Sequence, residues 1–260
     1  MSARNGLDLT GKRALVTGGG AGLGRQMAEA LAEAGASVVV CGRRAERLED
    51  MTRTLTERGC AVRAIPADVT VEADLERLHA ETGEIDILVN NAGYSIRTPW
   101  QDVPLEEWRE VMAINVEAPL RLCQLFVPAM MDRGWGRVIN VASMYGVVAG
   151  DPALYGELGL DIASYFASKH ALIGLTRYLA AMIGETGVTV NALSPGAFPD
   201  TPANASKSVQ DMLGPFAART PVKRVGGDED LRAAVVYLAS PGSAFYTGQN
   251  MIVDGGWTIW

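Results

Sequence analysis

The stretch that decides the fold is LVTGGGAGLGRQMAEAL, residues 15–31. A short apolar run ends in a glycine cluster, and apolar residues then recur at three- and four-residue spacing over 22–34, the pattern of one helix face. Glycine tolerates the positive φ angles and close backbone approach that such a turn needs. The start of the helix offers unpaired N–H groups and a positive dipole end, which suit a pyrophosphate. The stretch therefore predicts a strand, a nucleotide-binding turn and a helix, and the alternative is a purely structural turn.

Short β-branched runs and longer amphipathic stretches alternate along the rest of the chain. Strands are predicted at 13–17, 37–41, 61–65, 86–90, 137–141, 188–193 and 250–253. These runs are apolar almost throughout, as a parallel sheet buried on both faces requires. We therefore expect an α/β, Rossmann-like fold, with a doubly wound, seven-stranded parallel sheet, helices on both faces and a single domain over residues 1–260.

Two proline-bearing segments interrupt this pattern. The segment 104–133 should be mostly helical with kinks at Pro119 and Pro128, because proline lacks a donor and clashes one turn back. The segment 194–221 carries several prolines and follows a strand. In open α/β sheets ligands bind at the carboxyl ends of strands, so we expect a long loop or a short helical lid there.

Composition excludes several classes of function. The 260 residues are 48% hydrophobic and 20% charged, with a formal net charge of −7, which argues against nucleic-acid or anionic-membrane partners. Two histidines and three cysteines without C-x-x-C spacing leave little for a metal, and the odd cysteine count suits a reducing compartment. No signal-peptide run or membrane span is apparent, so we expect a cytoplasmic protein with a small-molecule substrate.

Several short motifs follow one another in a characteristic order. They are Thr17, Gly18, Gly22 and Gly24 in T-G-x-x-x-G-x-G, NNAG at 90–93, Asn115, Ser143, Tyr165-x-x-x-Lys169, SPG at 194–196 and VDGG at 253–256. The first motif has one more residue between its first two glycines than the G-x-G-x-x-G fingerprint. Over nearly the whole chain the sequence resembles the classical short-chain dehydrogenase/reductase family. The resemblance implies NAD(P)-dependent hydride transfer between nicotinamide C4 and a secondary alcohol or ketone.

The candidate catalytic residues are Asn115, Ser143, Tyr165 and Lys169. Tyr165 and Lys169 lie four apart and so share one helix face. The ammonium and a bound nicotinamide cation should lower the phenol pKa from its ordinary value of about 10, so that Tyr165 serves as general acid or base. Ser143 would donate to the substrate oxygen. The resemblance implies that Lys169 also binds the nicotinamide ribose, and that Asn115 relays protons to it through water.

The cofactor-binding residues predicted with the help of this resemblance extend along the chain. They are Thr17, Gly18, Gly22, Leu23, Gly24, Arg43, Arg44, Asp68, Val69, Asn91, Ala92, Gly93, Tyr165, Lys169, Pro195 and Gly196. Gly42 stands where an NAD-preferring site usually has an acidic residue, and Arg43 and Arg44 could pair with a 2′-phosphate. We therefore expect NADP(H) to be favoured over NAD(H), unless both arginines are merely solvated. Asp68 would contact the adenine, or would only cap the next helix.

The stretch between Ser143 and Tyr165 is longer than the family usually has. Tyr155 lies nearer the usual spacing, but Gly159 stands where its partner lysine would be. We therefore assign the catalytic role to Tyr165. The extra segment, 150–162, is predicted to form part of the substrate wall, and the alternative is an exposed decoration.

The substrate is only broadly indicated. Within the family, the sequence looks most like the enzymes that act on sugars, sugar acids or polyols. The features that carry this likeness are the strand end GRR, the 150–162 segment and PGAFPDTP (195–202). One alternative is a reductase of 3-oxoacyl thioesters on acyl carrier protein, although a net charge of −7 offers no basic docking surface. Another is a non-catalytic dinucleotide-binding regulator, against which the intact catalytic residues argue. Members of this family commonly form such assemblies, so the resemblance implies a homotetramer or homodimer.

Overall fold

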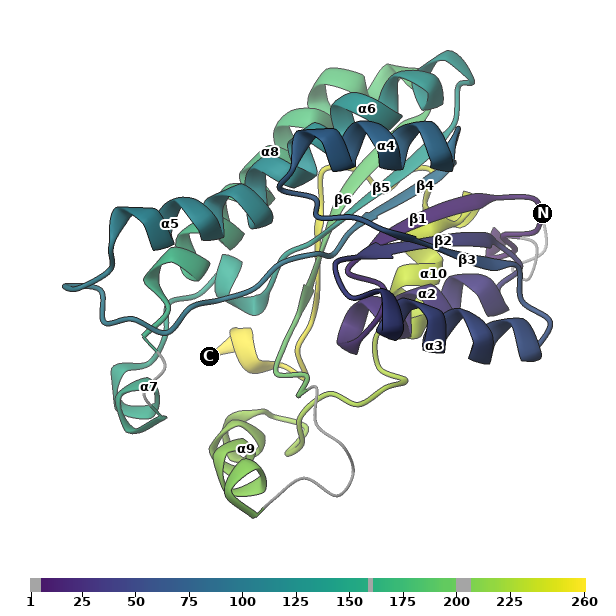
Figure 1. Ribbon diagram of the computed structural model, residues 1–260. Helices are drawn as coiled ribbons and strands as arrows, with labels where there is room; N and C mark the ends of the chain where they lie inside the picture. Colours follow the sequence, from purple (N-terminus) through teal and green to yellow (C-terminus); the bar gives the residue numbers. More distant parts are fainter. Residues whose placement is uncertain (1–5, 159–160, 200–206) are drawn as a thin grey trace.

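The computed structural model describes residues 6–158, 161–199 and 207–260 (Figure 1). Seven strands form one sheet in the order β3-β2-β1-β4-β5-β6-β7, and neighbouring strands pair in parallel. They are β1 (Arg13–Thr17), β2 (Ser37–Gly42), β3 (Val62–Pro66), β4 (Ile87–Asn90), β5 (Gly136–Val141), β6 (Val188–Pro195) and β7 (Asn250–Val253). The predicted Rossmann-like α/β sheet is confirmed, with strand bounds within two residues of those expected.

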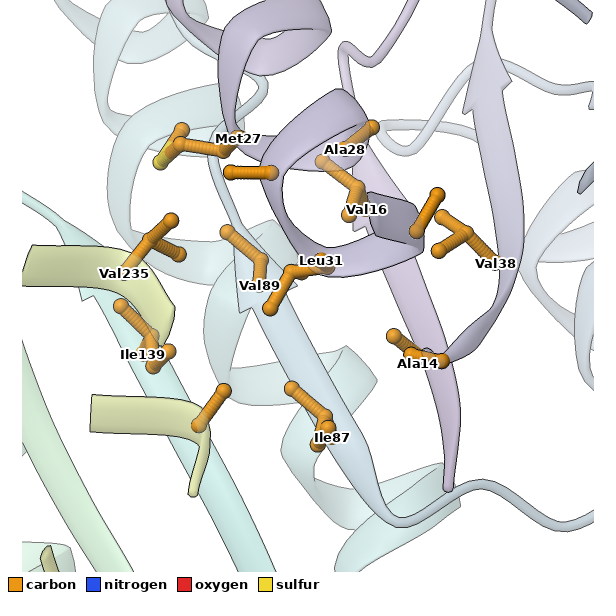
Figure 2. Close-up of a cluster of buried hydrophobic side chains, with 14 of the residues drawn as sticks. Ala14, Val16, Met27, Ala28, Leu31, Val38, Ile87, Val89, Ile139 and Val235 are labelled. Atoms are coloured by element: carbon orange, nitrogen blue, oxygen red, sulfur yellow. The ribbon is translucent and has the colours of Figure 1, made fainter. Parts of the chain in front are cut away.

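Helices cover both faces of the sheet (Figure 1). One layer holds α2 (Gly22–Glu33), α3 (Ala45–Glu57) and α10 (Arg232–Ala239), and the other holds α4 (Glu72–Thr82), α6 (Ala118–Asp132) and α8 (Ala163–Ile183). Figure 2 shows the core of the first layer, where Leu31 of α2 and Val235 of α10 lie against Ile87, Val89 and Ile139 of the sheet.

Consecutive residues of a central strand enter different cores, because strand side chains alternate between faces. Val16 of β1 belongs to the core beneath α2, whereas Leu15 belongs to the core beneath α4 and α6. Each such fully buried aliphatic side chain stabilises the fold by about 1.5–3 kcal/mol. Burial on both faces explains why the strands are apolar almost throughout.

The predicted break at Pro119 is a π-helical turn. Helix α5 (Leu105–Met112) passes into Ala113–Glu117, where the Ala118 N–H bonds to the Ala113 carbonyl five residues back. Pro119 has no N–H for the carbonyl of Asn115, and its ring would crowd that oxygen in a regular helix. The turn widens as a result. By contrast, α6 continues through Pro128 to Asp132, so the helix does not end there and the kink expected at Pro128 stays a prediction.

Two short helices lie beyond the carboxyl ends of the strands (Figure 1). Helix α7 (Pro152–Leu158) belongs to the 150–162 segment, and α9 (Lys207–Arg219), with Pro215 inside it, belongs to the predicted lid. Residues 159–160 and 200–206 of these segments lie outside the described residues. Short helical turns complete the chain at Met144–Gly146, Gly184–Thr186, Pro241–Ser243 and Trp257–Ile259.

None of the helices within the described ranges is long and apolar enough to cross a membrane.

Candidate active site

A cavity of about 540 Å³ lies along the carboxyl ends of the strands, where the predicted motifs meet. Its wall includes the glycine turn, the end of β2, the NNAG loop, Ser143, the Tyr165–Lys169 pair and the SPG turn. Of the predicted site residues, only Thr17 and Asn115 are not part of this wall. The topology therefore brings together residues that lie as much as 178 positions apart, from Gly18 to Gly196.

The glycine turn needs its glycines because the backbone is tightly packed. Gly18 has a φ of +65°, and a Cβ on Gly24 would lie 2.2 Å from the Gly18 carbonyl oxygen. The first turn of α2 has Ala21 at its N-cap, and no described side chain caps it. Because Gly20 to Gly24 line the cavity, the helix start fits a pyrophosphate.

Thr17 lies behind the cavity wall and is 1% exposed. Its hydroxyl oxygen accepts from the backbone N–H groups of Asn91 and Ala92, both at 2.9 Å. The Asn91 side-chain amide in turn donates to the Thr17 carbonyl at 2.9 Å. Thr17 therefore ties the end of β1 to the NNAG loop from behind the cavity wall, so a contribution to cofactor binding would be indirect.

Asn115 is also buried behind the wall. Its Nδ2 donates to the Tyr94 carbonyl (3.1 Å) and to Ser168 Oγ (2.9 Å), while its Oδ1 accepts from the Tyr94 N–H (3.2 Å). A Cβ on Gly93 would lie 2.5 Å from Asn115 Oδ1 and 3.6 Å from Lys169 Nζ. Asn115 is therefore beside Lys169 as expected, but its amide is occupied, so a relay through that amide finds no support.

Helix α8 carries Tyr165 and Lys169 into the cavity one turn apart. Lys169 is 4% exposed and donates from Nζ to the Val141 carbonyl at 2.8 Å, and its burial lowers the ammonium pKa to about 8. Burial raises the pKa of Tyr165, with a hydrogen bond to Ser143 acting in the opposite direction. The predicted lowering by Lys169 is therefore not found in the protein alone, where desolvation of the phenolate is the largest cause and the Ser143 hydrogen bond is the one that opposes it.

Ser143 follows β5 and is 6% exposed in the cavity wall. Its Oγ accepts from the backbone N–H of Tyr145 at 3.1 Å. Since that bond uses a lone pair, the hydroxyl proton stays available to donate to another oxygen. This is the arrangement expected of a group that stabilises charge on a substrate oxygen.

Arginines gather at the far end of the cavity, at the end of β2. Arg43 and Arg44 line it as predicted, and so does Arg47, which the sequence analysis missed. The signal for Arg47 was present, because it follows Arg44 at the three-residue spacing of one helix face. Arg43 Nη1 lies 4.0 Å from Asp68 Oδ2, a loose pair in which the arginine side chain is 66% exposed.

Asp68 does not cap the next helix. Its Oδ1 accepts from the backbone N–H (2.9 Å) and the hydroxyl (2.7 Å) of Thr70, whereas α4 begins at Glu72 after Val71. Both Asp68 and Val69 line the cavity. The capping alternative was therefore wrong, and Asp68 shapes a turn at the cavity edge.

Further lining residues were missed because they carry no motif. They are Gly20, Ala21, Leu48, Ala67, Tyr94, Ser95, Ile114, Val141, Ala142 and Phe198. Most of them adjoin a motif residue in the sequence and could have been found from that adjacency. Leu48 and Phe198 adjoin no predicted site residue, and only the tertiary structure brings them to the cavity.

Tyr155 is not an alternative catalytic tyrosine. It is 7% exposed, does not line the cavity, and its hydroxyl lies 2.6 Å from that of Tyr145. Asp151, at the start of the same segment, pairs with Arg219 of α9. In the described part of the 150–162 segment, Tyr155 and Ile162 are buried whereas Pro152 and Ala153 are exposed, and none of these described residues lines the cavity, so the place of the segment in a substrate wall stays a prediction.

Comparison with known proteins agrees with this geometry. A family model described as Enoyl-(Acyl carrier protein) reductase matches residues 18–258. The chain is 34% identical to the 5-keto-D-gluconate 5-reductase of Escherichia coli (strain K12), covering 96% of this chain and 97% of that protein. It is 36% identical to the galactitol 2-dehydrogenase (L-tagatose-forming) of Cereibacter sphaeroides, with complete coverage of both. It is also 34% identical to the 3-oxoacyl-(acyl-carrier-protein) reductase of Escherichia coli (strain K12), over 96% of this chain and 98% of that one.

Among solved structures, a gluconate 5-dehydrogenase from Burkholderia cenocepacia J2315, in complex with NADP and tartrate, superposes with a TM-score of 0.87. The two are 34% identical, and the match covers 99% of each chain. Identity above 30% over almost the whole chain, together with the matched family model, establishes the relationship. The chain belongs to the classical short-chain dehydrogenase/reductase family, and it is an NAD(P)-dependent oxidoreductase that transfers hydride between nicotinamide and a hydroxyl or keto carbon.

Proposed function

We propose that this protein interconverts a secondary alcohol and a ketone on a sugar, sugar acid or polyol, with NADP(H) preferred over NAD(H). The observation that carries the proposal is that Ser143, Tyr165 and Lys169 line the same cavity as the glycine turn and three arginines. The cavity therefore combines a dinucleotide cradle with a proton-transfer group at one end and positive charge at the other.

The proton chemistry is assigned to residues of this chain. Bound nicotinamide gives or takes the hydride at C4. Ser143 donates its hydroxyl proton to the substrate oxygen, which holds the reacting carbon in place. Tyr165 gives a proton to that oxygen during reduction and takes one during oxidation. Lys169 keeps one N–H on the Val141 carbonyl at 2.8 Å, which leaves two for the nicotinamide ribose and the phenol.

Asn115 is proposed to support this group by position. Its amide holds the Tyr94 backbone and Ser168 on α8, and Gly93 separates it from the cavity. Pro119 cannot donate to the Asn115 carbonyl, so that carbonyl is the better candidate for a water that passes protons to Lys169.

The preference for NADP(H) is argued from charge. Three arginines, Arg43, Arg44 and Arg47, line one end of the cavity. Asp68, which pairs loosely with Arg43, is the single carboxylate among the lining residues, and Gly42 at the strand end supplies none. A 2′-phosphate would find charge-assisted donors there, whereas the ribose hydroxyls of NAD would find no carboxylate at the strand end. The related structure from Burkholderia cenocepacia contains NADP, which supports the same choice.

The cofactor test is the affinity of the purified protein for NADPH and NADH. We expect tighter binding of NADPH, and a loss of about tenfold or more in that preference in Arg43→Ala or Arg47→Ala, the usual effect of one charged hydrogen bond. Arg53→Ala is the matched control, because Arg53 lies on α3 together with Arg47 but does not line the cavity. Equal affinity for both cofactors in the wild type would overturn the preference.

The substrate class is proposed from the relatives, which include enzymes named for ketogluconate, galactitol and gluconate. The equally similar 3-oxoacyl reductase keeps the thioester alternative open to test. With a net charge of −7, this protein offers no overall electrostatic attraction to an acidic carrier protein. Initial rates with gluconate, galactitol and a 3-oxoacyl thioester, each with both cofactors, decide between them. Turnover of the thioester alone would overturn the sugar assignment.

We also propose that the chain forms one domain, with 194–221 as a lid, and that it assembles as a homotetramer or homodimer. Large apolar side chains that stay exposed support assembly, among them Phe245, Tyr178, Met182 and Trp260. Two of them, Tyr178 and Met182, lie four residues apart on α8 and so share one exposed helix face. Light scattering after size exclusion checks this proposal, and a monomer at micromolar concentration would contradict it.

A further inference from the structure

We propose that Tyr145 is a positioning residue for the catalytic group, and that Tyr155 of the 150–162 segment holds Tyr145 in place through a pair of hydroxyls. The inference rests on the catalytic roles proposed for Ser143 and Tyr165. Neither Tyr145 nor Tyr155 lines the cavity, so both would act through the residues that do.

Tyr145 contacts both catalytic hydroxyl residues. Its backbone N–H donates to Ser143 Oγ at 3.1 Å, which directs the serine proton elsewhere. Its ring meets the Tyr165 ring edge to face, with centroids 6.4 Å apart and planes at 80°. A shift of Tyr145 would therefore move the serine acceptor bond and the packing surface of the catalytic phenol together.

The position of Tyr145 is fixed by Tyr155 and Phe166. The two tyrosine hydroxyls are 2.6 Å apart, and the Tyr145 ring packs on Phe166 with centroids 4.7 Å apart. Burial raises the pKa of both tyrosines, so both stay neutral and one hydroxyl must donate to the other. Leaving a buried hydroxyl without a partner is unfavourable, which keeps the Tyr145 side chain in one rotamer.

Tyr155 is itself anchored by the segment around it. Its ring lies edge-on to Phe216 of α9, with centroids 6.3 Å apart, and Asp151 pairs with Arg219 of the same helix. Gly150 permits the close turn, since a Cβ there would lie 3.0 Å from Tyr155 Cδ2 and 3.3 Å from Phe166 Cζ. The 150–162 segment thus connects the predicted lid helix to the catalytic group through Tyr155 and Tyr145.

A purely structural role for the pair predicts a different outcome from a positioning role. Tyr155→Phe removes one hydroxyl and keeps the ring, so packing stays while the Tyr145 hydroxyl loses its partner. If Tyr145 positions the catalytic group, kcat falls about tenfold with KM within about twofold, because small misplacements near the reacting atoms lower turnover steeply. The pH profile of kcat/KM shifts as well, because the surroundings of Tyr165 change.

The experiment measures kcat, KM and the pH profile with NADP(H) and the best substrate of the panel above, in Tyr155→Phe, Tyr145→Phe and the double variant. Tyr237→Phe is the matched control, since Tyr237 lies on α10, packs edge to face on Tyr246 and does not line the cavity. Similar losses in the two single variants, and no further loss in the double variant, would support the proposal. Tyr145→Phe also tests it from the other side of the pair if Tyr155→Phe folds poorly.

Two results would overturn the inference. In one, Tyr155→Phe matches Tyr237→Phe in kcat and pH profile. In the other, only Tyr145→Phe is impaired, which would remove the 150–162 segment from the catalytic group. Failure of the proposed function would look different, because the wild type would then bind cofactor and turn over no member of the panel.

Discussion

Replacing Lys169 with methionine should stabilise the cofactor-free protein while removing its activity. Burial lowers the Lys169 pKa from 10.5 to about 8, so near pH 7 the folded state holds an ammonium in a poorly solvating site. That shift corresponds to about 3 kcal/mol of free energy. Methionine is of similar length and carries no charge. It forfeits the bond to the Val141 carbonyl, worth about 1 kcal/mol, which leaves a net gain of about 2 kcal/mol.

The same reasoning fixes the pH dependence. Between pH 8 and 10.5 the unfolded chain binds more protons at this lysine than the folded protein does, so wild-type stability rises with pH there. The advantage of Lys169→Met is therefore largest below pH 8 and shrinks as the pH approaches 10.5.

Urea unfolding of both proteins near neutral pH and at about pH 9.5, at one protein concentration and without cofactor, measures this difference. Lys12→Met, outside the cavity, is a control of opposite sign, because it removes an ammonium that lies 3.6 Å from the Trp135 ring centroid and should therefore lower stability. A Lys169→Met variant less stable than the wild type at neutral pH, or an advantage equal at both pH values, would refute the reasoning. Either result would mean that the buried Lys169 ammonium does not lower the stability of the folded protein.

Three further outcomes are expected. Tyr165→Phe should lower kcat by at least about 100-fold, the usual worth of a general acid–base group, with cofactor affinity retained in a binding titration; undiminished turnover would contradict the assignment. Gly24→Ala should abolish cofactor binding and lower the melting temperature, because its Cβ would lie 2.2 Å from the Gly18 carbonyl; unchanged calorimetric binding would show that the turn adapts. Asn115→Ala should destabilise the protein to urea by about 2–3 kcal/mol, since it removes the side-chain partner of the Tyr94 N–H and carbonyl, while Ser168 Oγ keeps its bond to the Tyr165 carbonyl; loss of activity at full stability would point to a direct catalytic role.

The sheet and the glycine turn follow from local sequence. Runs such as 37–41 are apolar on both faces, and only a strand between two helical layers buries both. The turn at Gly18 needs a positive φ, which glycine adopts without strain. The motif residues that line the cavity could also be predicted from the sequence, because the chemistry of a motif depends on residue type and spacing.

Contacts between elements could not be predicted in this way. The π-helical turn at Ala113–Glu117 buries the Asn115 amide against Tyr94 and Ser168, although the motif alone suggested a relay residue. The pKa of Tyr165 is raised because burial outweighs the hydrogen bond to Ser143, and the extent of burial cannot be deduced from Tyr-x-x-x-Lys.

The sequence by itself thus determined the layers of the protein from a local pattern, and through the family resemblance it predicted the cradle for a dinucleotide and the residues proposed for proton transfer. Only the tertiary structure decided that Arg47 joins the arginine end, that Thr17 serves the NNAG loop, and that Tyr155 pairs with Tyr145. The physical reason is that hydrogen bonds and desolvation depend on which side chains meet across elements, and packing of the whole chain sets those meetings.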